Sequence, residues 1–368
     1  MGISQPVVVA IPARNEEERI GPCLEALARQ PDSRFIQVVV LLNNCTDDTV
    51  PLVRGLGEHL PMIIHPIVVD LPPSRAGAGR ARRMAMDQAA RLAPDGVLLT
   101  TDADGCVAPD WIAANLAAMR RGVEAVAGQA VIDPVEAALI PAHLHEADAW
   151  EQVYTGLLDE IACLIDPDPA DPWPRHTQHS GASIAVTAAA YRKARGMPEV
   201  AVGEDRAFIH ALRCVDIRIR HAPEVEVVVS GRTVGRAAGG MADTIRRRMV
   251  MPDELLDAAL EPAGASLRRS QLRRACRDVW SGLRDPRDVL RRLASALAMR
   301  PDHLQECLSR CFFGAGWAEI EQTSPALMRQ PVRAADVAEE ILHARRILAT
   351  LHHQGRQPAA HPAELAAD

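Results

Sequence analysis

Two aspartates stand one residue apart after an apolar run. Residues 97–101 predict a buried strand, and Asp102-Ala103-Asp104 follows it directly. Side chains two residues apart leave a strand on one side, so these two carboxylates repel each other unless a cation lies beside them. Hard divalent cations prefer such oxygen ligands. The spacing predicts a metal site at Asp104 and Asp102; the alternative is an Asp-rich turn in which Gly105 makes the bend.

A second pair of acids, Glu204-Asp205, follows Gly203 and opens a helical pattern. A carboxylate at this position in a cleft is a candidate general base. The alternative interpretation is two acids that are favoured by the positive N-terminal end of the helix.

Polar residues also follow the first two apolar runs. Residues 7–11 lead into Pro12-Ala13-Arg14-Asn15-Glu16-Glu17, a turn and helix start that can bind an anion or can be an ordinary acid-capped loop. Residues 37–42 lead into Asn43-Asn44, where Asn44 either hydrogen-bonds a base edge or caps a helix.

Arginines beside glycines form two further candidate anion sites. Residues 77–83 carry Arg80, Arg82 and Arg83 after two glycines, and residues 230–237 carry Arg232 and Arg236 four apart. Such arginines suit a diphosphate, although any one of them can equally lie on a solvated helix face. Residues 77–79 are not a dinucleotide fingerprint, because the third glycine is missing and the segment follows the third strand.

A Pro/Asp-rich segment, residues 166–174, interrupts the helical and strand patterns and predicts a long, mobile loop. Trp173, His176 and His179 lie on it or just after it, and Gly181 and Ala182 follow. We expect this loop to cover an acceptor.

The elements that must position these residues alternate regularly. Apolar strands at residues 7–11, 37–42, 62–69 and 97–101 are separated by amphipathic helical patterns, which predicts a mostly parallel α/β sheet covered by helices on both faces. Ligands of such sheets gather at the carboxyl ends of the strands, where the polar residues stand. After Gly240 only helical patterns remain. The expected organisation is an α/β domain over residues 1–240, a helical region over 241–353 and a flexible tail over 354–368.

Composition excludes several functions. The formal charge of −7 and the 3% aromatic content argue against a nucleic-acid partner. Lys193 is the only lysine, so a Gly-Lys-Ser/Thr phosphate loop is absent. The eight scattered cysteines indicate reduced thiols in a cytoplasm, and neither a spanning segment nor a secretory signal is recognised. Residues 241–300 carry 13 arginines and 8 acids, which predicts peripheral membrane contact through basic helices or simply solvated helices.

Taken together, residues 5–240 resemble glycosyltransferase family 2 on the GT-A fold. Residues 12–17 look like its first nucleotide-binding segment, Asp102-Ala103-Asp104 like its metal-binding Asp-x-Asp, and Glu204-Asp205 like its Glu-Asp pair, whose Asp is the base. Asn43-Asn44 stands where the family has an Asp pair, and Arg232 to Arg236 stands in the place of a Gln-x-x-Arg-Trp motif without matching it. The Asn pair leaves the nucleobase open, because an amide can present either a donor or an acceptor. The unmatched arginine motif and the lack of a spanning segment argue against a processive membrane polymer synthase.

The resemblance implies an inverting transfer from a nucleotide-diphosphate sugar to an acceptor hydroxyl, with Mn²⁺ or Mg²⁺ as cofactor. The nucleotide-sugar site is then expected to include the following residues: Pro12, Ala13, Arg14, Glu17, Asn43, Asn44, Arg80, Asp102, Arg232 and Arg236. Two alternatives are a nucleotidyltransferase, which would need a glycine-rich loop and lysine after the first strand, and a non-catalytic scaffold of the same fold. The donor sugar, the acceptor and the oligomeric state are not visible in the sequence.

Overall fold

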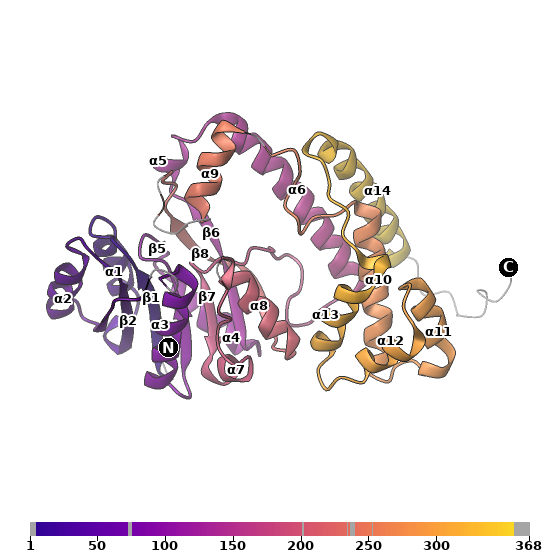
Figure 1. Cartoon of the computed structure of the whole chain (residues 1–368), viewed down its shortest axis with the longest axis horizontal. Helices are drawn as coiled ribbons and strands as arrows, with labels where there is room; N and C mark the ends of the chain where they lie inside the picture. Colours follow the sequence, from indigo (N-terminus) through magenta and orange to yellow (C-terminus); the bar gives the residue numbers. More distant parts are fainter. Residues whose placement is uncertain are drawn as a thin grey trace. The chain divides into compact units, whose positions relative to one another are not determined.

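The computed structural model describes residues 5–72, 76–200, 202–233, 235, 240–251 and 253–356 (Figure 1). The chain forms two compact units. Unit 1 comprises Met1–Leu144, Pro169–Pro252 and Glu306–Ile320, and unit 2 comprises His145–Asp168, Asp253–Gln305 and Glu321–Asp368.

Unit 1 is built on one sheet of eight strands in the order β3-β2-β1-β4-β7-β6-β8-β5. The first four strands in this order pair in parallel, as do β6 and β8, whereas β7 is antiparallel to both neighbours and β5 is antiparallel to β8. The strands are β1 (Val7–Ala13), β2 (Ile36–Asn43), β3 (Ile63–Val69), β4 (Val97–Thr100), β5 (Cys106–Val107), β6 (Ala125–Ile132), β7 (Ile184–Thr187) and β8 (Ile219–Val229).

Helices cover both faces of this sheet because alternate strand residues point to opposite sides. Val7, Val9 and Ile11 of β1 pack in one apolar cluster with residues of α1, α2 and α4, whereas Val8 and Ala10 pack in a second cluster with residues of α3, α7 and α8. The helices of unit 1 are α1 (Ile20–Ala28), α2 (Thr49–His59), α3 (Ala78–Leu92), α4 (Trp111–Arg120), α5 (Pro134–Ala137), the start of α6 (Ala142–Ile165), α7 (Ala188–Lys193), α8 (Glu204–Cys214), α9 (Met241–Val250) and most of α13 (Phe313–Thr323).

The strand register brings three polar loops to one edge. Ala13 at the end of β1 pairs with Leu42 of β2, and Ala10 pairs with Thr100 at the end of β4. The loops that follow β1, β2 and β4 therefore begin side by side at the carboxyl ends of the parallel strands.

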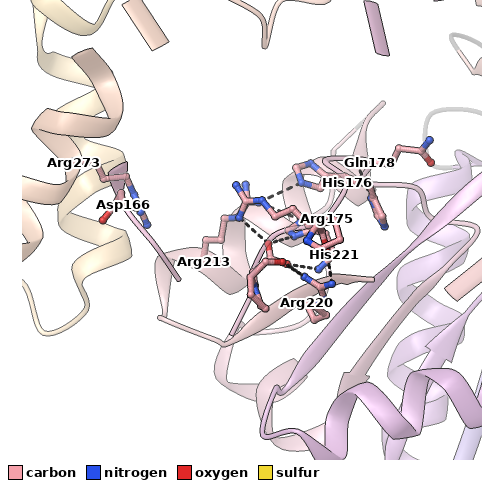
Figure 2. Close-up of polar contacts among 12 residues, drawn as sticks. Asp166, Arg175, His176, Gln178, Arg213, Arg220, His221 and Arg273 are labelled. Atoms are coloured by element: carbon pink, nitrogen blue, oxygen red, sulfur yellow. Dashed lines mark hydrogen bonds and ion pairs between the residues drawn. The ribbon is translucent and has the colours of Figure 1, made fainter. Parts of the chain in front are cut away.

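Unit 2 is helical in its described residues. Tyr154, Leu158 and Ile161 of α6 share an apolar cluster with residues of α10 (Ala263–Trp280) and α14 (Val337–Arg356). The unit also contains α11 (Pro286–Ala296) and the first residues of α12 (Pro301–Leu308). The arginines of α10 have acidic partners: Arg269 pairs with buried Glu261, and Arg273 and Arg277 both pair with Asp166, one of these contacts being visible in Figure 2.

This architecture confirms the predicted fold class, a sheet of Rossmann-like α/β type flanked by helices and followed by an α-helical C-terminal region. The sequence analysis expected one boundary, at residue 240, whereas each unit is made of separate chain segments. Residues 145–168 belong to unit 2, and residues 306–320 belong to unit 1. The difference arises because α6 is one continuous helix whose two ends pack in different units. Residues 354–356 lie in α14, and residues 357–368 lie outside the described part.

Two sequence expectations concerned membranes and thiols. Among the described helices, none is both long and apolar enough to cross a bilayer. None of the eight cysteines, all of which lie within the described ranges, forms a disulfide.

Candidate active site

The two aspartates of the Asp102-Ala103-Asp104 motif face arginines from different parts of unit 1. Asp102 Oδ1 accepts from Arg82 Nη2 at 2.5 Å, and Asp104 Oδ2 lies 3.1 Å from Arg232 Nη2. Arg232 also pairs with both carboxylate oxygens of Glu16, at 2.6 and 2.8 Å. The loop that carries Arg232 is fixed by Glu136, which accepts from the Ser230 hydroxyl and the Gly231 N–H.

Arg82 on α3 is a buried guanidinium, with only 6% of its side chain exposed. Besides Asp102 it donates to Glu204 Oε1 at 3.2 Å, to Thr100 Oγ1 at 3.0 Å and to the Gly181 carbonyl at 2.8 Å. One side chain thus joins the end of β4, the loop before β7 and the start of α8.

Asp205 lies beside the same loop. Its Oδ2 accepts from the Gly181 N–H at 3.1 Å, and its Oδ1 accepts from the Arg206 N–H at 2.7 Å. Burial raises the pKa of the Asp205 carboxyl, and the neighbouring Glu204 raises it further, against the lowering effect of these hydrogen bonds. The backbone of Gly181 therefore connects the two side chains: its carbonyl accepts from Arg82 and its N–H donates to Asp205.

The loops after β1 and β2 bind each other. Asn15 Oδ1 accepts from the Thr46 N–H at 2.8 Å, and Glu17 Oε2 accepts from the Asp48 N–H at 2.8 Å. Asn44 uses both ends of its amide on the backbone of Leu71, so it holds the segment after β3. These hydrogen bonds join the loops that follow β1, β2 and β3 at the strand ends.

The predicted donor residues are placed as follows. Pro12 and Ala13 end β1, Arg14 is exposed beyond them, and Arg80 on α3 pairs with Glu199 at 2.7 Å. Asn43 ends β2 and is buried, and its Oδ1 has no hydrogen-bond partner among the described residues. Arg236 lies outside the described residues.

The loop expected to cover the acceptor is tied to β8. Asp171 is buried and accepts from the backbone N–H of His221 at 2.8 Å and from its ring Nδ1 at 2.6 Å. Arg220 donates to the carbonyls of Pro172 and Pro174. His176 lies near His221 (Figure 2), and the ring of His179 is also close to that of His221. Trp173 is 42% exposed, whereas Ala182 is buried.

The sequence prediction missed several residues of this site. Arg213, Arg220 and His221 were not in the expected set. Glu16 and Asp171 appeared only within longer candidate segments, and Arg82 only as one of several arginines. His221 is a buried residue of β8. A histidine among the apolar residues of a strand was the signal that could have indicated its polar partner.

The donor set suits a divalent cation. Four carboxylates, those of Glu16, Asp102, Asp104 and Glu204, face the two guanidinium groups of Arg82 and Arg232, which leaves an excess of two negative charges. The pKa of Asp104 is raised to about 6, first by burial and then by the charge of Asp102. A bound cation of charge two would offset this excess.

Comparisons with known proteins give the following. Residues 8–168 match the sequence model of Glycosyl transferase family 2. No curated protein sequence matches the chain. Solved structures of low similarity include TarS 1–349 of S. aureus in complex with UDP-GlcNAc, which is 16% identical over 96% of this chain and 93% of its own, with a TM-score of 0.47. The mannosyltransferase PcManGT from Pyrobaculum calidifontis in complex with GDP-Man and Mn²⁺ is 18% identical over 96% and 81%, with a TM-score of 0.44.

The charge excess predicts an effect on stability. Because the folded-state pKa of Asp104 is raised above 3.8 to about 6, the folded state binds the proton more tightly, and stability falls as pH rises between these values. In metal-free buffer, Asp104→Asn should therefore raise the free energy of unfolding at pH 8 by up to about 3 kcal/mol and change it little at pH 4. Denaturant titrations at both values measure this. Exposed Asp95→Asn is the control, and an equal gain at pH 4 and pH 8 would contradict the prediction.

Proposed function

Because residues 8–168 match the sequence model of Glycosyl transferase family 2, we propose that the protein transfers a sugar, with inversion, from a nucleotide-diphosphate sugar to an acceptor hydroxyl. The observation that carries the proposal is the position of Asp205, which is linked through one residue, Gly181, to the guanidinium that binds Asp102. The carboxylates that would hold a cation and the carboxylate that would accept a proton thus share the contacts of Arg82 and Gly181.

Asp104, with Asp102, would hold Mn²⁺ or Mg²⁺, which when bound neutralises the negative charge that develops on the departing diphosphate. Arg232 lies 3.1 Å from Asp104 and would act on the same diphosphate from the other side. Hydrogen bonds among the loops after β1, β2 and β3 support the nucleotide-binding site that we expect around Pro12, Asn43 and Asn44.

Asp205 would take the proton of the acceptor hydroxyl as that oxygen attacks the anomeric carbon from the face opposite the diphosphate. Its raised pKa makes it a better proton acceptor than an exposed aspartate. The two backbone N–H groups that bind its oxygens keep it oriented without neutralising it.

The first test of the function is metal-dependent nucleotide binding. We expect a nucleoside diphosphate to raise the melting temperature of the full chain in Mn²⁺ or Mg²⁺, and chelation or Asp104→Asn to remove most of that rise. Asp95→Asn should behave as wild type. A non-catalytic scaffold predicts no metal-dependent rise, and an unchanged rise in excess chelator would rule out the metal.

The second test separates the two acids at the start of α8. Asp205→Asn should lower turnover about 10²-fold or more, while metal-dependent nucleotide affinity stays near normal, because a general base acts on the transition state. Glu204→Gln should keep most turnover, since an amide oxygen still accepts from Arg82 Nε. If Glu204→Gln is inactive and Asp205→Asn is normal, Glu204 is the base.

We further propose a cytoplasmic protein that contacts anionic membranes through α9. Arginines pair with acids on both basic helices, Arg269 with Glu261 on α10 and Arg246 with Asp243 on α9, so the choice of α9 rests on the exposed apolar residues at its end. Residues 241–251 carry three arginines and one aspartate. At the end of this segment Val250 is 84% and Met251 64% exposed. Exposed apolar residues beside arginines suit a lipid surface.

Vesicle sedimentation tests this surface. The full chain should bind anionic vesicles at low salt, and Val250→Asp should abolish most of that binding by placing a charge where an apolar contact is expected. Leu283→Asp, which places the same charge at an exposed apolar residue of unit 2, is the matched control. Equal binding to neutral and anionic vesicles would contradict the proposal.

A further inference from the structure

Arg232 shares one nitrogen between two acids. Its Nη2 lies 2.6 Å from Glu16 Oε1 and 3.1 Å from Asp104 Oδ2, while its Nη1 donates to Glu16 Oε2 at 2.8 Å. The pairing with Glu16 is therefore bidentate, which is the strong form of an arginine–carboxylate contact. The contact with Asp104 is single and longer, so it is the weaker of the two.

Both ends of the pairing with Glu16 are held in place. The Glu16 side chain is 6% exposed, and the Glu16 N–H donates to the hydroxyl of Thr49 at the start of α2. The Arg232 N–H donates to Ser230 Oγ, and the Ser230 hydroxyl in turn donates to Glu136. The guanidinium is thus held from two sides, by the backbone of its own loop and by an acid of the loop after β1.

Arg82, the other arginine of the site, is bound more completely. Its side chain is 6% exposed and has acceptors on three segments. It also packs on Gly181, where an added Cβ would lie 2.7 Å from Arg82 Cζ. The Arg232 side chain is 19% exposed, and loss of its contact with Asp104 leaves both hydrogen bonds to Glu16 intact. Of the two arginines, Arg232 is therefore the one that can exchange a carboxylate partner.

The contact with Asp104 sets Arg232 against a cation. Asp104 is a predicted ligand of Mn²⁺ or Mg²⁺, and a guanidinium 3.1 Å from that carboxylate repels a second positive charge that approaches it. With no cation bound, the same guanidinium offsets part of the excess negative charge of the four carboxylates of the site. Arg232 therefore stabilises the metal-free protein and opposes metal binding at the same time.

A diphosphate removes this conflict. Guanidinium groups bind phosphate oxygens in the same two-point geometry that they use for carboxylates. A diphosphate beside the cation gives Arg232 a new anionic partner and leaves Asp104 to the cation. Repulsion between the arginine and the cation is then offset, because the negative charge of the diphosphate lies close to both.

We infer that Arg232 is the internal counter-ion of Asp104 and that it makes the binding of cation and nucleotide interdependent. Arg232 pairs with Asp104 while both ligands are absent and with the diphosphate once both are bound. The inference rests on the proposed function, because it concerns the donor side of that same site. Loss of the arginine charge then has opposite effects: it tightens cation binding to the chain alone and weakens nucleotide binding in the presence of the cation. A residue with a purely structural role would change both affinities in the same direction.

The test measures Mn²⁺ binding to the full chain by electron paramagnetic resonance of the free ion. The titration is made at fixed ionic strength and at pH 8, where Asp104 is ionised because its pKa is about 6. We expect Arg232→Gln to tighten Mn²⁺ binding about tenfold in the absence of nucleotide, since a unit charge beside the ligand is removed. Arg121→Gln removes the same charge from an arginine paired with Glu224 and should change the affinity less than about twofold.

A second titration adds the nucleoside diphosphate that raises the melting temperature of the chain. In the wild type, saturating nucleotide should tighten Mn²⁺ binding, and linkage requires Mn²⁺ to tighten nucleotide binding by the same factor. In Arg232→Gln this factor should fall about tenfold, with weaker nucleotide binding at saturating Mn²⁺. Arg232→Lys keeps the charge, so its Mn²⁺ affinity without nucleotide should stay within about threefold of wild type. If Arg232→Lys instead matches Arg232→Gln, the charge is not the cause and the inference is wrong.

Further outcomes separate the inference from the proposed function. If Arg232→Gln leaves Mn²⁺ affinity without nucleotide unchanged or weakens it, Arg232 does not oppose the cation, and the proposed function stands. If the wild type binds nucleotide equally well in Mn²⁺ and in excess chelator, and Arg232→Gln loses that binding, the arginine takes the place of the cation and the inference is overturned. If the wild type binds no nucleoside diphosphate, the proposed function fails, and the interdependence fails with it.

A second variant covers a loss of folding. If Arg232→Gln does not fold, Arg232→Met replaces it, because methionine keeps an apolar stem of similar length and removes the charge. The same gain in Mn²⁺ affinity without nucleotide, and the same loss of nucleotide affinity in Mn²⁺, are expected. Equal Mn²⁺ affinities of Arg232→Met and wild type would overturn the inference.

Discussion

The buried guanidinium of Arg82 is the interaction on which the rest of the site depends. A buried arginine cannot lose its charge and is tolerated only where acceptors surround it. Asp102, Glu204, Thr100 and the Gly181 carbonyl supply those acceptors from three separate segments of unit 1. Because each of these acceptors must reach the same planar group, the end of β4, the loop before β7 and the start of α8 take fixed relative positions. Asp205 is placed by that geometry, since it binds the N–H of the same Gly181.

On the donor side, Arg232 does not fully compensate the charge of the acids around it. It binds Glu16 through two hydrogen bonds and Asp104 through one contact, yet the carboxylates around it and Arg82 still outnumber the arginines. The raised pKa of Asp104 is the electrostatic consequence of this arrangement. A protein selected only for stability would reduce such repulsion, so the uncompensated charge is consistent with a site built to bind a cation.

Local patterns predicted the first four strands of the chain, the helices between them and the two acidic motifs, because each of these is encoded in residues close together in the chain. The role of Arg82 was not predicted, because Arg80 and Arg83 on the same helix have the same chemistry, and only packing decides that Arg82 is the buried one. Arg82 precedes Ala85, Met86 and Ala89 by three, four and seven residues, and all three are buried. This helical spacing was the signal that could have placed Arg82 on the buried face. The pairing of Asp171 with His221 and the assignment of α6 to two units join distant segments, which no local pattern encodes.

The proposed site then has a donor side and an acceptor side that meet at Gly181. The donor side carries two excess negative charges around Arg82 and Arg232. This charge would repel a diphosphate unless a divalent cation held by Asp102 and Asp104 offset it. Asp205 lies on the other side of Gly181, where an acceptor can present a hydroxyl to the donor.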